Sequence, residues 1–397
     1  MKKLFTIGLG QCFGSIIPVM VWAVMGKLHG DAFANGMAFT YPYQFIFAIL
    51  WHATYVGNIK HGLKDGHDAC DFGRTGILVG MAAGILVTVV SVCNMDMIGG
   101  FLGVSSRTDR WAFLFGIGSM AIDWPAYYLG EQYQYYGDDR RGTRFIAMWY
   151  ILKLALVCIT AIPMFGCSEA VVFILTVQAV ILVVLMVKHG IPHKMRFSLY
   201  QGMRYTIHDM FYNAFMTVIY LFGIHGMSVE DISLLAAFNL MVLCTDTQWD
   251  VCGSAIDILV TTYVCDGTFE KRRKKIFGDN LLFSLFMAVS CYGMLWVMLF
   301  MYKDVDPLIT LIFISIELST MVPYGAIDTM TAYIGVQYPN AWTGILTILK
   351  YTVRITAQSL IPSPYAISIA LPVAVVLDLP FRILLYRKAR KKAIIQT

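Results

Sequence analysis

Apolar residues fill most of the chain in runs of about twenty, separated by short polar stretches. A helix needs ~20 mostly apolar residues to cross the hydrocarbon core of a membrane, so each run predicts one spanning helix. No gap between the runs is long enough for a soluble domain. We predict twelve spans, at 5–25, 36–56, 76–95, 110–134, 144–166, 169–188, 200–224, 232–258, 280–302, 315–336, 342–361 and 366–386.

One motif occurs twice, 205 positions apart. Duplicated halves with polar residues at membrane depth are typical of secondary transporters. We therefore predict an all-α integral membrane protein with two six-helix lobes, 1–194 and 195–397, around a central cavity. Because six is even, the two repeats have the same orientation in the membrane. The matched residues are Ala121, Ile122, Asp123, Tyr128, Gly130, Gln132 and Tyr133 in the first copy and Ala326, Ile327, Asp328, Tyr333, Gly335, Gln337 and Tyr338 in the second.

Composition agrees with the membrane interpretation. The chain is 58% hydrophobic and 14% charged, whereas soluble domains carry roughly 25% charged residues. With the amino terminus inside, the inner loops and tails hold 21 of the 30 basic residues, as the positive-inside rule expects. We predict a monomeric, multi-pass protein of the plasma (inner) membrane with both termini in the cytoplasm. Topology explains the net charge of +5 without nucleic-acid binding.

Acids inside the predicted spans are the candidates for function, since an ionised group in the bilayer core costs at least ~2.5–3.5 kcal/mol. Asp246 and Asp250 are four residues apart and so lie on one helical face, and Asp257 returns to the same stripe. Such a stripe must face a wet cavity or partner groups. We assign Asp257 a structural role, and Asp250 either a structural role or one in ion coupling.

Asp328 is the strongest candidate. Tyr324 lies one turn before Asp328 on the same face, and Pro323 and Gly325 predict a loosened helix with exposed carbonyl groups. Carboxylate, hydroxyl and carbonyl oxygens suit Na⁺ or H⁺ by ligand hardness. We predict no cofactor, and no metal other than a Na⁺ ion at Asp328.

Other polar residues offer weaker candidates. Asp123 is the first-half equivalent of Asp328, and it acts either as a second coupling site or only as a brace. Asp209 follows His208, and His52 lies in the second span. Histidine titrates near neutral pH, so each histidine either relays protons or bonds a neighbouring helix. Gln11 is the strongly polar residue of the first span.

Together these features resemble the multidrug and toxic compound extrusion (MATE) transporters, within a superfamily that includes polysaccharide and lipid flippases. The resemblance covers most of the chain as 6+6 spans. Its motifs are Gly202 after a basic inner loop, the turns His29-Gly30 and His225-Gly226 before alanine-bearing helices, the inner loop 265–272, and Asp306-Pro307 followed by Pro323.

The resemblance implies a cation site in the second half. One MATE branch uses an acid on span seven and a Tyr-x-x-x-Asp pair on span ten. Tyr324 and Asp328 match that pair, and Asp209 lies near the span-seven position with a shifted register. Another branch uses an aspartate in span one, where this chain has Gln11. The implied function is antiport, not enzyme catalysis: a Na⁺ or H⁺ gradient drives export of organic, cationic amphipathic compounds.

Three alternatives stay open. A lipid- or polysaccharide-precursor flippase of the same superfamily would move a lipid-linked substrate instead of a small molecule. A major-facilitator transporter also has 6+6 spans, and 139–144 resembles its Asp-Arg-x-Gly loop, although after span four instead of span two. Asp246-x-x-x-Asp250 resembles the Mg²⁺-binding pairs of membrane prenyltransferases, which need a second acidic motif.

Overall fold

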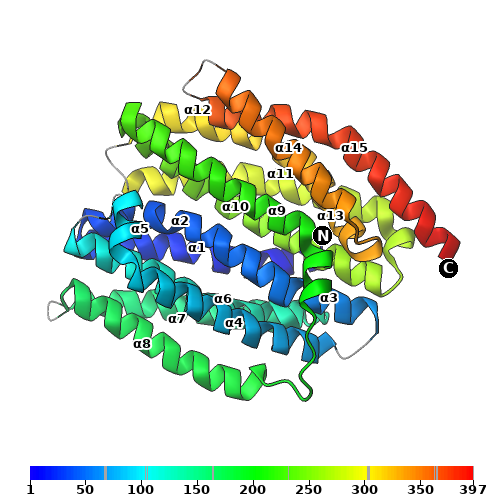
Figure 1. Ribbon diagram of the computed structural model, residues 1–397, viewed down its shortest axis with the longest axis horizontal. Helices are drawn as coiled ribbons and strands as arrows, with labels where there is room; N and C mark the ends of the chain where they lie inside the picture. The colour runs from blue at the N-terminus through cyan, green and yellow to red at the C-terminus, as the bar shows by residue number, and fades with distance from the viewer. Residues whose placement is uncertain are drawn as a thin grey trace. The chain divides into compact units, whose positions relative to one another are not determined.

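The regular structure of the protein is helical (Figure 1). A computed structural model describes residues 1–66, 69–102, 104, 106–162, 165–230, 232–301, 305–361, 363 and 365–396. A helix covers each predicted span, and seven helical segments of the described part are long and apolar enough to cross a membrane. The prediction of an all-helical, multi-span membrane fold is confirmed.

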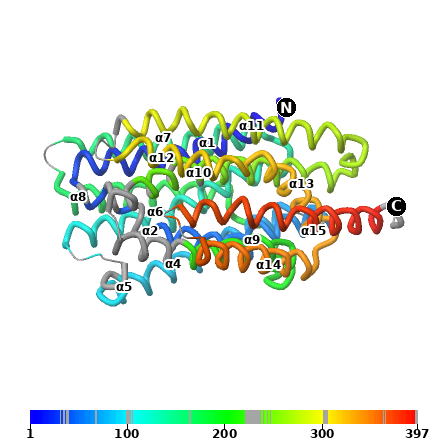
Figure 2. The backbone as a smooth tube through the Cα atoms, turned by 90° about the horizontal axis from the view of Figure 1, so that it is seen from above, coloured from blue at the N-terminus to red at the C-terminus, as the bar shows by residue number. Residues whose placement is uncertain are grey.

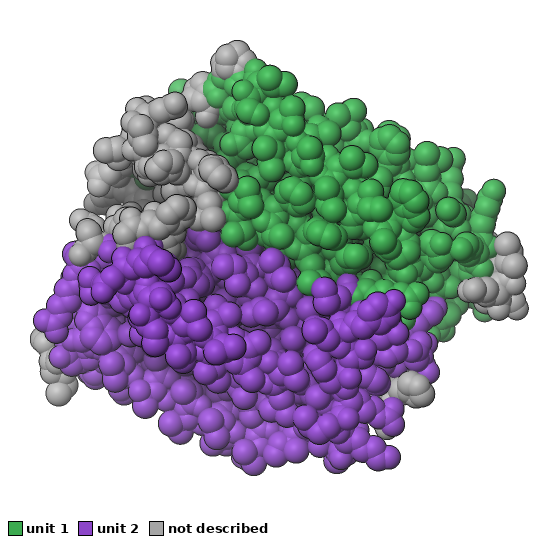
Figure 3. Space-filling model, in the orientation of Figure 1, with its two compact units in different colours: residues 1–12, 204–397 green, residues 13–203 purple. Residues whose placement is uncertain are grey.

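The chain forms two compact units, coloured separately in Figure 3. Unit 1 comprises Met1–Cys12 with Arg204–Thr397, and unit 2 comprises Phe13–Met203. The first residues join unit 1 because Phe5 packs edge-on against Phe283, with ring centroids 5.4 Å apart. The six-helix lobes 1–194 and 195–397 and their repeat relation stay a prediction.

In unit 2, α6 is the central helix. A capping box between Ser106 and Asp109 starts it, and it continues through Pro125. It packs against α2, α4, α7 and α8. The helices that lie wholly or mainly in this unit are α1 (Lys2–His29), α2 (Asp31–Trp51), α3 (Gly57–Lys64), α4 (Ala69–Cys93), α5 (Met95–Leu102), α6 (Arg107–Tyr135), α7 (Asp139–Ile159) and α8 (Cys167–Leu185), with π-helical segments at His52–Val56 and Met186–Gly190.

A backbone-on-backbone crossing explains Gly202. A Cβ atom on Gly202 would lie 2.0 Å from the carbonyl oxygen of Ala53, inside the first π-helical segment. The segment leading to Gly202 is fixed by side-chain acceptors: the Asp71 carboxylate accepts from the backbone N–H of His193 at 2.8 Å. Asn58 Oδ1 likewise accepts from the backbone N–H of Ser198 at 2.9 Å. The close approach therefore requires glycine.

In unit 1, α13 occupies the corresponding central position. It packs against α10, α11 and α15, while α14 packs against α15 and α12 against α10. α9 lies beside α14 (Figures 1 and 2). The two copies of the repeated motif thus lie on the central helices of their own units. The bounds are α9 (Leu199–Glu230), α10 (Ile232–Cys265), α11 (Phe269–Met301), α12 (Pro307–Leu318), α13 (Met321–Gln337), α14 (Ala341–Leu360) and α15 (Ala366–Gln396).

The predicted span 315–336 is divided between two helices. α12 ends at Leu318 and α13 begins at Met321, so the break precedes Pro323. Pro323 lies in the first turn of α13, where its missing N–H breaks no intrahelical hydrogen bond. A Cβ atom on Gly325 would lie 2.1 Å from Ser284 Oγ of α11. The glycine therefore allows two helices to pack closely, and the helix is not loosened at Asp328.

Candidate functional site

Asp328 lies within α13, and its side chain is half-exposed. Its carboxyl group has no hydrogen bond or ion pair within the described part of the chain. The carboxyl groups of Asp209 on α9 and Asp257 on α10 lie near enough to interact with it electrostatically, as does the guanidinium of Arg382 on α15. Four helices of unit 1 therefore bring ionisable groups around one accessible carboxyl.

The three carboxyl groups make this region favourable for a cation. Asp209 and Asp257 are half-exposed like Asp328, and carboxylates held near one another repel unless a proton or a cation reduces their charge. Among the described residues, no three histidine, cysteine, aspartate or glutamate side chains are close enough to hold one metal ion. A Na⁺ ion at Asp328 would therefore need further oxygen ligands from hydroxyl groups, carbonyl groups or water.

Tyr324 belongs to an aromatic group rather than to the Asp328 carboxyl. It is buried, and its hydroxyl lies 3.4 Å from the hydroxyl of Tyr351. Its ring meets Trp249 edge-on, with centroids 4.5 Å apart. The Lys350 ammonium lies 3.9 Å from the centre of the Tyr324 ring. The sequence pair Tyr324 and Asp328 is thus one turn apart on α13 with no hydrogen bond between the two side chains.

Buried charged residues surround this region. Arg382 is completely buried and bonds Asp378 one turn earlier on α15, with Nη2 3.2 Å from Oδ1. An arginine that snorkels to the cytoplasmic face would not be buried in this way, so that alternative for Arg382 is wrong. Arg354 lies 3.7 Å from Glu317. The Asp378 partner was missed, although its spacing of four residues from Arg382 is the signal for such a pair.

The acidic stripe of α10 is only partly visible. Asp250 is exposed and has no hydrogen bond or ion pair among the described residues. Its spacing of seven residues from Asp257 places both on one helical face. The side chain of Asp246 lies outside the described residues. The structure therefore places Asp250 and Asp257 along α10, with Asp257 beside Asp328.

Asp123 has a different environment from its counterpart Asp328. It is buried and forms an ion pair with Lys153 of α7. Its Oδ1 atom accepts from Trp149 Nε1 and from Gln178 Nε2 of α8, each at 3.0 Å. These partners on two neighbouring helices occupy the carboxylate, which favours the role of a brace over that of a coupling site.

The remaining candidates are distributed through the chain. Gln11 is buried and belongs to unit 1, whereas Asp123 belongs to unit 2. His52 Nδ1 lies 2.7 Å from the carbonyl oxygen of Ala48. His208 Nδ1 bonds the hydroxyl of Thr347 on α14. The structure thus joins both histidines to neighbouring polar groups, one within its own helix and one across to the next.

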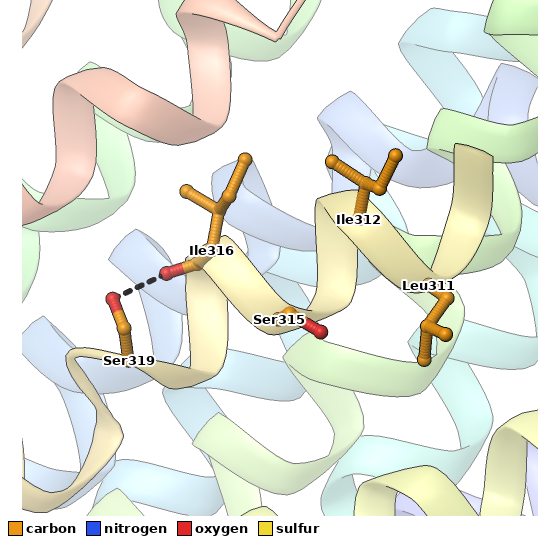
Figure 4. Close-up of a pocket in the computed structure, with 5 residues that line it drawn as sticks. All are labelled: Leu311, Ile312, Ser315, Ile316 and Ser319. Atoms are coloured by element: carbon orange, nitrogen blue, oxygen red, sulfur yellow. Dashed lines mark hydrogen bonds between the residues drawn. The ribbon is translucent and has the colours of Figure 1, made fainter. Parts of the chain in front are cut away.

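An open hollow on α12 is a separate feature (Figure 4). Its volume is about 490 Å³, and its walls are Leu311, Ile312, Ser315, Ile316 and Ser319. The Ser319 hydroxyl donates to the carbonyl oxygen of Ile316 at 2.6 Å. The lining has no ionisable side chain, so this hollow cannot supply the charge that a coupling ion requires.

Solved structures identify the fold. No protein-family model matches the chain, and no curated protein does. A mutant of the Vibrio cholerae MATE transporter VcmN is 15% identical, with a TM-score of 0.75 over 98% of this chain and 97% of that one. The fold is that of the MATE transporters. The family resemblance inferred from the sequence is confirmed at the level of the fold.

Two further MATE structures agree. A MATE mutant, whose organism is not given, is 13% identical, with a TM-score of 0.70 over 98% of this chain and 97% of that one. An outward-facing multidrug resistance transporter of the MATE family, again of unspecified organism, is 11% identical, with a TM-score of 0.66 over 98% and 96%. The chain is a multi-pass membrane protein with a multidrug-transporter fold, and the match supports neither the major-facilitator nor the prenyltransferase alternative.

Proposed function

We propose that this protein is an antiporter that exports organic cations, driven by a Na⁺ or H⁺ gradient, and that Asp328 binds the coupling cation. The observation that carries the proposal is the Asp328 carboxyl group: half-exposed, without a partner among the described residues, and beside two further carboxyl groups. It lies on the central helix of its unit, within a MATE fold.

The coupling follows from charge. A carboxylate at membrane depth without a partner is costly, and a proton or Na⁺ ion relieves that cost. If the cation binds one orientation of the protein better than the other, it shifts the equilibrium toward that orientation. A substrate that prefers the opposite orientation reverses the shift. Exchange of the two ligands across the membrane then results from one two-state equilibrium.

Aromatic side chains beside the acids support a cationic substrate. Trp249, Tyr324 and Tyr351 lie in the same unit as Asp328, and aromatic faces attract organic cations. One MATE transporter with this fold was crystallised in complex with Br-NRF, so a protein of this fold can hold a small molecule. The proposal includes a monomer in the plasma (inner) membrane with both termini in the cytoplasm.

A second candidate is a flippase for an anionic lipid-linked precursor. Lys350, Arg354 and Arg382 are buried cations of unit 1, and phosphate groups are bound by lysine and arginine. Arg354 and Arg382 already have carboxylate partners, which leaves less charge for a substrate anion. Export of an organic cation therefore remains the primary proposal.

Ethidium transport in inverted vesicles tests the antiporter proposal. Separate H⁺ and Na⁺ gradients would be applied to the wild type, to Asp328→Asn, and to the control Asp96→Asn, whose side chain is 84% exposed. We expect one gradient to drive transport in the wild type and in the control but not in Asp328→Asn. Equal transport in all three proteins would remove Asp328 from the mechanism, and no transport under either gradient would favour the flippase.

A further inference from the structure

Lys350 is a buried cation without a carboxylate partner. Its side chain is 4% exposed, and it has no hydrogen bond or ion pair within the described part of the chain. Other buried cations are paired: Lys153 with Asp123, and Arg382 with Asp378. The three N–H donors of the Lys350 ammonium meet aromatic rings instead.

The rings form a cage around this ammonium group. The Nζ atom of Lys350 lies 3.9 Å from the ring centre of Tyr324 and 5.1 Å from that of Tyr351. Trp249 packs edge-on against Tyr324 at 4.5 Å, and Phe215 stacks on Tyr351 at 5.8 Å. The rings come from α9, α10, α13 and α14, so four helices build one cage.

The cage extends toward an accessible surface. Tyr324 and Tyr351 are buried, whereas Trp249 and Phe215 are half-exposed. The outer rings can therefore meet a molecule from outside the cage, and the inner rings hold the ammonium. An aromatic cage of this kind recognises alkylammonium groups through the negative faces of its rings. The chain thus fills an alkylammonium site with a side chain of its own.

We propose that Trp249, Tyr324 and Tyr351 bind the alkylammonium group of the exported cation, and that Lys350 is a tethered occupant which the substrate displaces. This inference rests on the proposed function and adds the substrate site to it. A displaced Lys350 ammonium has an anionic group within electrostatic range, because Asp378 acts on it from α15. Arg382 and Arg354 also act on Lys350, and their repulsion favours its departure from the cage.

The position of the cage suits exchange with the coupling cation. Tyr324 precedes Asp328 by one turn of α13, a rise of about 6 Å along the helix axis. A substrate cation in the cage and a coupling cation at Asp328 would therefore repel each other. Mutual exclusion of two like charges at neighbouring sites is what an antiporter needs.

Binding of tetraethylammonium to the purified full-length protein tests the proposal without any ion gradient. Lys350→Met removes the tethered charge and keeps an unbranched side chain of similar length. We expect it to bind radiolabelled tetraethylammonium at least tenfold more tightly than the wild type in equilibrium dialysis. Adding Tyr324→Leu should abolish the gain. The matched control is Lys392→Met, since Lys392 lies 4.4 Å from the centre of the Tyr338 ring on an exposed surface, and its removal should leave binding unchanged.

Unchanged or weaker binding by Lys350→Met would overturn the proposal. If that variant does not fold, Lys350→Gln replaces it with the same expectation and the same contrary result. Gradient-driven ethidium transport by the wild type, with no gain of tetraethylammonium binding in either variant, would reject the cage alone. Tighter binding in the variants without any wild-type transport would reject the antiporter function and keep the binding site.

Discussion

Removal of the Asp123 carboxylate should destabilise the protein through the charge that it leaves behind. Lys153 has a side chain only 3% exposed and is ion-paired with Asp123. Breaking one partner of a buried ion pair costs about 3–5 kcal/mol. In Asp123→Asn, the amide oxygen still accepts a hydrogen bond from Trp149 or Gln178, so little is added to that cost. A loss of 3–5 kcal/mol lowers the ratio of folded to unfolded protein by about 10²- to 10³-fold or more.

The double variant Asp123→Asn/Lys153→Met separates charge from packing. It removes both charges together, so no ion remains unpaired, and we expect it to recover all but about 1 kcal/mol of the stability. Reversible denaturation in mixed detergent micelles measures both proteins against the wild type. Wild-type stability of Asp123→Asn, or a double variant less stable than the single one, would refute this account. Ion-coupled ethidium transport by folded Asp123→Asn is expected to persist.

Two further predictions concern packing and a second ion pair. Gly202→Ala places a Cβ atom 2.0 Å from a backbone carbonyl oxygen, so we expect it to lower the denaturation midpoint by roughly 1–3 kcal/mol of stability or more; Gly253→Ala, where no atom lies within 4 Å, should not, and equal midpoints would contradict the crossing. Asp378→Asn should cost about 3–5 kcal/mol because it leaves the completely buried Arg382 unpaired. The same denaturation assay should show recovery in Asp378→Leu/Arg382→Met, and no recovery would argue against an ion-pair origin.

The hydrophobic pattern was sufficient to predict the helices, because lipid requires a continuous apolar surface and a fully bonded backbone. The repeat also had a structural correlate that could be predicted in kind, since Asp123 and Asp328 lie on the central helices of their units. Local cues were less reliable. Pro323 and Gly325 predicted a loosened helix, but the break falls earlier, and the glycine serves close packing against α11.

Partners between helices could not be predicted from the sequence. Whether Asp123 is a brace or a site depends on the rotation of α7 and α8, which bring Lys153 and Gln178 to it. Spacing within one chain segment does not fix that rotation. Tyr324 was expected beside the Asp328 carboxyl by spacing alone, but Lys350 on α14 and Trp249 on α10 form its environment.

Displacement of the coupling cation by substrate tests the central claim most directly. Purified protein in weakly buffered detergent would be mixed with ethidium while proton release is followed with a pH indicator and bound ²²Na⁺ by rapid filtration. We predict that ethidium releases one of the two cations from the wild type and from Asp96→Asn, and none from Asp328→Asn. Equal release from the wild type and from Asp328→Asn would contradict the assignment of the coupling cation to Asp328.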